Sequence, residues 1–297
     1  MDLILQQTIN AVALGGTYAL LALGLAVVFS IMRLINFAHG ELMTISGYVL
    51  MYCGMSGIPF AIAVVLALIA PMAAAIAMER IAFRPVRNAS GATMLVTSFA
   101  VSMILQVLFQ NLISARSQAV VLPDILSQST LIGGFVIGNN KIAAIATTIV
   151  ALIALDRFMN RQRHGIAMRA AAEDFAVARL MGIRANTVIS AAFALSGLLA
   201  GIASILWVSQ RASVDPLMGF TPVLKAFIAA ILGGLGSLRG AVAGGFVLGF
   251  IEIYLAAFLP SEIQEFRDPI GLTIVVLLLL ARPNGLIPSP TLKAEKV

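Results

Sequence analysis

An amide, an imidazole and a carboxylate lie within six residues of one another in a chain that otherwise avoids polar groups. Asn36, His39 and Glu41 occur in the stretch 35–48, INFAHGELMTISGY, which has apolar sequence on both sides. An imidazole and a carboxylate can act in acid–base catalysis or relay a proton. The same stretch can also be a break between two helices, because Asn is a frequent helix N-cap.

Catalytic and metal sites are not predicted by the spacing of these residues. His39 and Glu41 would point about 200° apart on a helix, and His39-Gly40-Glu41 is not the H-E-x-x-H zinc motif. G-x-S-x-G is absent, and His164 stands alone in a basic loop. The glycine-rich stretch 233–240, GGLGSLRG, lacks the Lys-Ser/Thr pair of a phosphate loop and is interpreted as close helix packing. We therefore expect no catalytic residue and no metal site, and no ATP hydrolysis by this chain.

A polar stripe marks the segment 91–115, GATMLVTSFAVSMILQVLFQNLISA. Its members recur every four residues, with Thr97 at the margin, and are Ser98, Ser102, Gln106 and Gln110. A four-residue spacing puts them on one slowly drifting helix face. Such groups can form hydrogen bonds between membrane helices, or they can form one wall of a water-filled path. The stripe carries no charge, which suits passage of a neutral zwitterion.

The elements that position these residues are hydrophobic helices. The 297-residue chain is 60% hydrophobic and 11% charged, well below the roughly 25% charge of soluble domains. Apolar stretches of about 20 residues indicate membrane spans. We predict an all-α integral membrane protein, a polytopic bundle of about 8–10 transmembrane helices forming one domain over 1–297. The nine predicted segments are 9–31, 38–56, 58–81, 91–115, 139–158, 187–209, 218–236, 240–259 and 268–282; of these, 38–56, 218–236 and 240–259 could be re-entrant.

The charges indicate orientation and exclude one class of partner. The net charge is +6, and basic residues cluster after the third segment, between the fifth and sixth, and after the last. The positive-inside rule then predicts a cytoplasmic C-terminus and, with nine spans, an external N-terminus. Contact with anionic membrane lipid is expected. No basic face with nucleic-acid-reading elements is present. Cys53 is the only cysteine, so no intrachain disulfide can form.

The connection 161–187, RQRHGIAMRAAAEDFAVARLMGIRANT, is long, charged and rich in helix formers. A helix is predicted between Gly165 and Gly182. It could rest on lipid headgroups or dock into a groove on a cytoplasmic partner. Docking is favoured, because the adjacent acids Glu173 and Asp174 would be repelled by anionic lipid.

This connection carries a family resemblance. AMRAAAEDFAVARLMGI resembles the coupling-loop motif of ABC-transporter permeases, in particular those for branched-chain amino acids of the LivH type. Three more stretches match that group: LGGTYALLALGLAVVFSIMRLINFAHGELMTISGY, FRPVR and ILGGLGSLRGAVAGGFVLG. The resemblance covers most of the chain, although Glu173-Asp174 replaces the Glu-Ala-Ala of the general motif.

The resemblance implies a subunit of an ATP-driven importer in the bacterial inner membrane. Its partners would be a homologous LivM-type permease, two cytoplasmic ATPases that use ATP and Mg, and an external substrate-binding protein. This chain itself would bind no cofactor. The ATPase contact would fall on Arg169, Ala170, Glu173, Asp174, Ala176, Ala178, Arg179 and Gly182.

The expected function is translocation of branched-chain or related amino acids by alternating access. One alternative is a permease of the same family for urea or short amides. Another is an ion-coupled transporter, which would need a mid-membrane relay among His39, Glu41, Lys225 and Glu252; most of these are expected near interfaces. In the favoured interpretation the stretch 35–48 is a helix break near the cytoplasmic face. Asn36 would cap the next helix there, and Asn36, His39 and Glu41 would line the inner gate.

Overall fold

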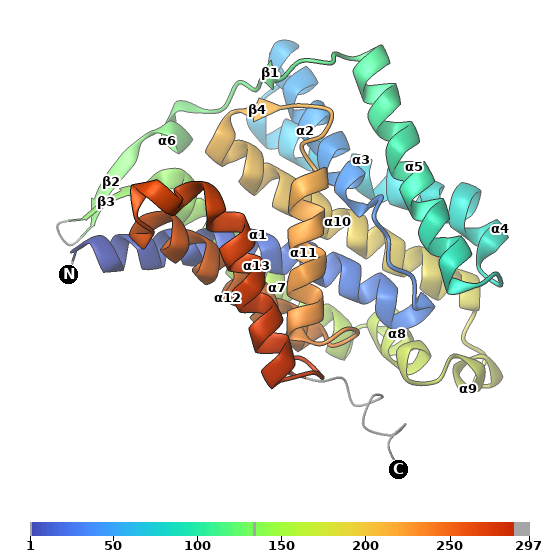
Figure 1. The fold of residues 1–297 in the computed structure, drawn as a ribbon. Coiled ribbons are helices and arrows are strands. Elements are labelled where there is room, and N and C mark those ends of the chain that lie inside the picture. Colours follow the sequence, from blue (N-terminus) through green and yellow to red (C-terminus); the bar gives the residue numbers. More distant parts are fainter. Residues whose placement is uncertain (1, 133–134, 288–297) are drawn as a thin grey trace.

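Long helices make up most of the fold. The computed structural model describes residues 2–132 and 135–287, and each of the nine predicted hydrophobic segments is a helix there (Figure 1). Their bounds are α1 Asp2–Met32, α2 His39–Met55, α3 Phe60–Met78, α5 Gly91–Leu112, α7 Asn139–Arg161, α10 Ala185–Arg211, α11 Phe220–Gly233, α12 Leu238–Phe258 and α13 Arg267–Ala281. Within the described ranges, six of the helical stretches are long and apolar enough to cross a membrane: α1, the stretch Phe60–Val86, α5, α7, α10 and α12. The predicted all-α membrane bundle is therefore confirmed.

Short elements join the long helices. The helical ones are the π-helix η1 Glu79–Phe83, α4 Arg84–Val86, α6 Asp124–Ser127, α8 Arg163–Glu173, α9 Phe175–Leu180 and the 3-10 helix η2 Ser261–Phe266. Strand β1 Gln118–Ala119 pairs antiparallel with β4 Ser213–Val214, and β2 Ser129–Ile132 pairs with β3 Phe135–Gly138. The second pair forms a short antiparallel ladder before α7.

The bundle has two distinct ends. The arginine-rich end contains the end of α1, the turns after α3, helices α8 and α9, and the end of α13; the hairpin end contains both strand pairs and η2 (Figure 1). Helix α1 lies at the centre, and most of its residues are buried. Small residues let α12 approach it closely, since a Cβ built on Gly245 would lie 2.4 Å from Ala19 Cα. This is the packing expected of glycines in membrane helices.

Two helices are short and begin inside the bundle. Helix α1 ends at Met32, and the chain turns at exposed Arg33, with φ +54°, and returns into the bundle before α2 starts (Figure 1). Helices α2 and α11 have 17 and 14 residues, hence lengths of about 25 and 21 Å against a hydrocarbon core of about 30 Å. Their starts touch, because a Cβ on Gly219 would lie 1.9 Å from Gly40 O. The re-entrant alternative for these two segments is supported, whereas α12 is long enough to span.

Glycine-rich stretch 233–240 is a tight corner between α11 and α12. A Cβ on Gly233 would lie 1.9 Å from Gly240 O, and Gly234 adopts φ +112°. Ser237 caps α12 by accepting a hydrogen bond from Gly240 N. The packing interpretation of these glycines is therefore confirmed.

Candidate functional site

A buried carboxylate joins α2 to α5. Glu41 is 1% exposed, and its Oε1 accepts hydrogen bonds from Ser102 Oγ at 2.9 Å and Gln106 Nε2 at 2.8 Å. Gln106 Nε2 also donates to Ser102 Oγ at 3.2 Å. These three hydrogen bonds make the cluster a specific attachment between the two helices.

The attachment continues one turn along α5. Ser98 Oγ accepts a hydrogen bond from Phe37 N at 3.3 Å, and it also lies 3.2 Å from Ile35 O and 2.8 Å from Leu95 O. Phe37 fills the space between α5 and α11, stacking on Phe99 with centroids 4.2 Å apart and meeting Phe227 at 5.5 Å. We call Ser98, Ser102, Gln106, Glu41 and Asn36 the α2–α5 polar seam.

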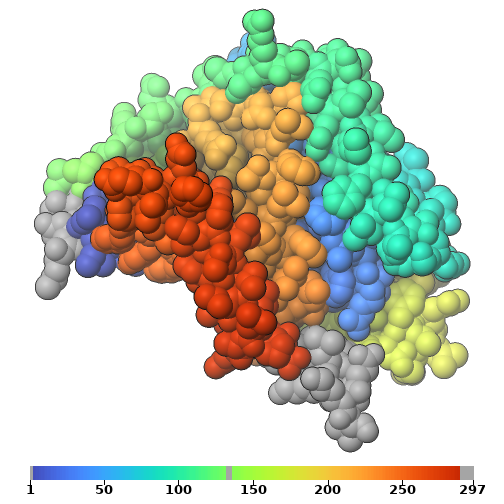
Figure 2. Space-filling view, viewed as in Figure 1, coloured from blue at the N-terminus to red at the C-terminus, as the bar shows by residue number. Residues whose placement is uncertain are grey.

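The seam is the main inward face of α5. The buried residues of this helix are Met94, Ser98, Ser102 and Phe109, so two of the four are polar. Its other face carries exposed apolar side chains such as Met103 at 64% and Ile104 at 59%. Figure 2 shows α5 standing to one side of α11, with α13 on the other. Helix α5 is therefore a peripheral helix held both by these hydrogen bonds and by the apolar contacts of Met94, Phe99 and Phe109.

Two members of the predicted stripe lie outside the seam. Gln110 is exposed, and Thr97 donates to Thr93 O at 2.8 Å on the outer side of α5. A spacing of four residues is slightly longer than one helical turn of 3.6 residues, so the stripe rotates around the helix and leaves the packed face after Gln106. Ser98, Ser102 and Gln106 are the stripe residues that the structure brings to Glu41 and to the returning connection.

The expected N-cap role of Asn36 is wrong. Helix α2 begins at His39, its N-cap position is Ala38, and His39 N donates to the backbone O of Asn36. The Asn36 side chain therefore lies too early to reach the first free N–H groups. It is 1% exposed, and among the described residues neither its Oδ1 nor its Nδ2 has a hydrogen-bond partner; the same holds for Glu41 Oε2.

The chain breaks at the arginine-rich end, but α2 starts farther inside the bundle than α1 ends. His39 packs on Gly24, which precedes the end of α1 by eight residues, or about 12 Å. Its Nδ1 lies 3.0 Å from Ser196 Oγ on α10. The break moves inward because residues 34–38 run back into the bundle from Arg33. Since His39 faces α10 while Glu41 faces α5, the two side chains do not form one proton relay.

The connection 161–187 folds as two helices rather than one. Asp174 interrupts the expected helix by capping α9, because its Oδ1 accepts from Ala176 N at 2.8 Å and Val177 N at 2.9 Å. Gly165 lies inside α8, where a Cβ would be 2.2 Å from Phe158 O. Gly182 ends α9 at φ +84°, with the paired terminal bonds of a Schellman motif.

Helix α9 presents an apolar surface at the arginine-rich end. Leu180 is 87% exposed, Met181 79% and Val177 53%. Of the residues assigned to the coupling contact, Ala170 is half-buried, and Ala178 is 4% exposed, so it packs inward instead of facing a partner. The remaining six are exposed: Arg169, Glu173, Asp174, Ala176, Arg179 and Gly182.

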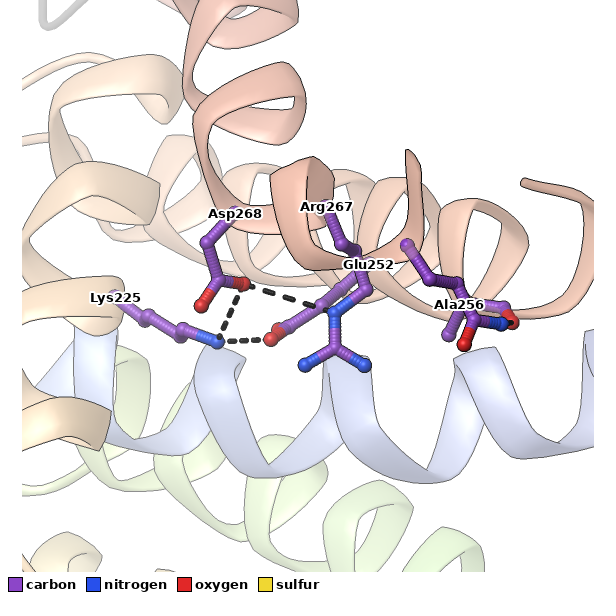
Figure 3. A network of polar contacts seen from close by, with 6 residues as sticks. Lys225, Glu252, Ala256, Arg267 and Asp268 are labelled. Atoms are coloured by element: carbon purple, nitrogen blue, oxygen red, sulfur yellow. Dashed lines mark hydrogen bonds and ion pairs between the residues drawn. The ribbon is translucent and has the colours of Figure 1, made fainter. Parts of the chain in front are cut away.

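A second charged cluster joins α11, α12 and α13. Lys225 forms an ion pair with Glu252, and its Nζ lies 3.8 Å from Asp268 Oδ1; Arg267 Nε lies 3.7 Å from the same oxygen (Figure 3). The sequence allowed a Lys225–Glu252 pair but did not predict the two residues of α13. The feature of these two residues that could have indicated a site is their position at the start of α13, directly after η2.

No group of three metal-ligating side chains occurs in the described part of the chain. The candidate site consists of hydrogen-bonding groups on α5, at the start of α2 and in the connection before it. Such an arrangement can bind and pass a polar solute, because broken helices in membranes place backbone and side-chain polar groups beside a path.

Known proteins identify the family. The model of the branched-chain amino acid transport system / permease component family matches residues 7–281. The chain is 36% identical to the high-affinity branched-chain amino acid transport system permease protein LivH of Salmonella typhimurium, over 99% of this chain and 97% of that protein. It is 33% identical to BraD of Pseudomonas aeruginosa, a permease protein with the same description, over 99% and 98%.

More distant matches are weaker. LivM of Escherichia coli, also a high-affinity branched-chain amino acid permease protein, is 28% identical over 52% of this chain and 36% of LivM. A solved structure of PsaBC from Streptococcus pneumoniae in complex with Fab covers 100% of this chain and 95% of its own, with a TM-score of 0.48 and 11% identity, a likeness too low to identify a shared fold. The full-length matches are sufficient: the chain belongs to the family of branched-chain amino acid transport system permease components.

Proposed function

We propose that this protein is the membrane-spanning permease subunit of an ATP-driven importer for branched-chain amino acids. The observation that carries the proposal is the near full-length identity to LivH and BraD, both named as permease proteins for these substrates. A LivM-type second permease, two ATPases using ATP and Mg, an external binding protein and the bacterial inner membrane complete the assembly. This chain carries the solute, and a partner hydrolyses the ATP.

The translocation path follows the α2–α5 polar seam. Separating α5 from α2 would break the hydrogen bonds to Glu41 and to residues 35–37. It would also break aromatic contacts such as Phe37–Phe99 and Tyr48–Phe109. Separation would uncover Glu41, whose Oε2 has no hydrogen-bond partner among the described residues, and the connection that contains Asn36. A carboxylate and an amide can bind the ammonium and carboxylate of a zwitterion, and the exposed outer face of α5 would meet lipid or the second permease.

The substrate class is tested by competition. Vesicles containing this chain, its permease partner, the ATPases and the binding protein are loaded with ATP, and uptake of labelled leucine is measured. Excess isoleucine or valine should abolish uptake, while urea and acetamide should leave it unchanged. Inhibition by the amides with no effect of the amino acids would replace this proposal by the urea or short-amide alternative.

Coupling to the ATPases is assigned to the exposed surface of α8 and α9. Val177, Leu180 and Met181 form an apolar patch outside the predicted membrane region, and a helix of this kind fits a groove on a partner. Glu173→Gln with Gly182→Ala should uncouple ATP hydrolysis from uptake, because the first removes a charge and the second strains the end of α9.

The matched control for coupling is Gly57→Ala. Gly57 has φ +69° and open space around it, as Gly182 does with φ +84°, but it lies at the hairpin end. Both alanines carry the same left-handed strain of about 1–2 kcal/mol. A Gly57 variant that uncouples as strongly as the loop variant, or a loop variant with unchanged coupling, would refute the assignment.

A further inference from the structure

A groove at the arginine-rich end lies outside the seam and shares only Arg169 with the proposed coupling surface. Helix α1 supplies its floor at Leu23, while α7 and α12 form its two walls and α8 reaches its end with Arg169. The groove has a volume of about 380 Å³. It is an open channel along the membrane-spanning part of the bundle, because α7 and α12 both pack on α1 and leave a space between them.

The walls of the groove are apolar. Beside Leu23, the apolar lining consists of Leu152, Leu155, Met159, Leu238 and Val242. The α7 residues among them lie in the last ten positions of a helix that ends at Arg161, and the α12 residues lie in its first turns. The apolar part therefore faces the hydrocarbon just inside one membrane boundary.

The rim of the groove carries two arginines. Arg169 and Arg239 are exposed, and in the parts of the chain that the structure describes neither guanidinium has a carboxylate within 4.0 Å. The one acid of the lining, Asp156, accepts a hydrogen bond from Asn160 Nδ2 at 2.8 Å. The rim thus has a net charge of +1 and two guanidinium groups with free donors, which suit phosphate oxygens.

This combination matches one chemical class of ligand. Apolar walls accept an acyl chain, and basic groups between helices at the predicted cytoplasmic boundary bind acidic headgroups. We propose that the groove binds one anionic glycerophospholipid, with its phosphate on Arg169 and Arg239 and an acyl chain along α7 and α12. A free phosphate ion would use the arginines but not the apolar walls. The bound lipid bridges α8 to α12 and so helps to fix the 161–187 connection.

The test is lipid retention by the purified full-length chain, measured by native mass spectrometry after equilibration with equal amounts of phosphatidylglycerol and phosphatidylcholine. The wild type should retain phosphatidylglycerol at least tenfold over phosphatidylcholine. Arg169→Gln with Arg239→Gln should remove this preference. The control is Arg157→Gln with Arg163→Gln, which removes two exposed arginines of the same end that do not line the groove.

Four results would overturn the proposal. The first is equal retention of the two lipids by the wild type. The second is equal loss in the control and groove variants, which would indicate nonspecific attraction. Val242→Phe fills the apolar part of the groove without changing its charge and should also reduce lipid retention about tenfold. The third result is unchanged retention in this variant. The fourth is displacement of the lipid by equimolar glycerol phosphate, and either of these two would show that the site binds only an ion. Unchanged size-exclusion profiles verify that each variant is folded.

Discussion

The hydrogen bond between Gln106 and Glu41 should help to hold α5 against α2, and this role can be tested. Gln106→Leu removes the 2.8 Å donor to Glu41 Oε1 and leaves Ser102 as the remaining donor to that oxygen. A hydrogen bond to a charged group contributes about 1.5–3 kcal/mol in proteins, while side-chain bonds within membranes average about 0.6 kcal/mol. Since about 1.4 kcal/mol is tenfold, the separated state of α5 should become about threefold to a hundredfold more populated.

The assay is alkylation of a cysteine placed on the inward face of α5. Met94 is 7% exposed and lies one turn from Ser98, so Met94→Cys should react only when α5 separates. Cys53, the natural cysteine, is buried and is replaced by Ala throughout. When α5 closes faster than the reagent reacts, the alkylation rate reports the open population.

A matched substitution separates this role from a general loss of polarity. Gln110→Leu makes the same change one turn along α5, at an exposed position away from Glu41. Alkylation should accelerate with Gln106→Leu and stay at the wild-type rate with Gln110→Leu. Equal rates in the two variants would refute the role of the seam in holding α5.

Two further substitutions probe how the short helices are held. Gly219→Ala would place a Cβ 1.9 Å from Gly40 O, so overpacking should lower the free energy of unfolding by about 1–3 kcal/mol or more. The control is Gly91→Ala, which has nothing within 4 Å of the added Cβ and should leave the melting temperature unchanged. Equal melting temperatures of the two variants would contradict the contact between α2 and α11. Lys225→Met leaves Glu252 without its cation and should destabilise by about 1–3 kcal/mol, between the values for surface and buried pairs. Adding Glu252→Met should restore much of that stability, and a double variant less stable than the single one would count against the pair.

Periodicity in the sequence predicted the face of α5 correctly over two turns. Ser98, Ser102 and Gln106 share that face because a four-residue spacing stays near one side of a helix over this distance. The partner Glu41 was not predictable, since it lies on another helix and nothing local specifies which helices meet. Hydrophobicity likewise located every long helix, because burial in lipid imposes a composition on the whole segment.

Two sequence-based predictions differ from the structure, and each difference has a local cause. The return of residues 34–38 into the bundle depends on Arg33 adopting φ +54°, which no residue preference indicates for arginine. The division of the 161–187 helix depends on Asp174 acting as a cap, although its charge also suits the start of a longer helix. In both places the tertiary position of the chain decided between alternatives that the sequence left equal.

The energy source of uptake tests the central claim most directly. Leucine uptake is compared between vesicles holding this chain alone under a proton gradient and vesicles holding the complete assembly with ATP and no gradient. A permease subunit should give uptake only in the complete assembly, and uptake should stop when the ATP is replaced by a non-hydrolysable analogue. Uptake by the isolated chain driven by the proton gradient would contradict the account.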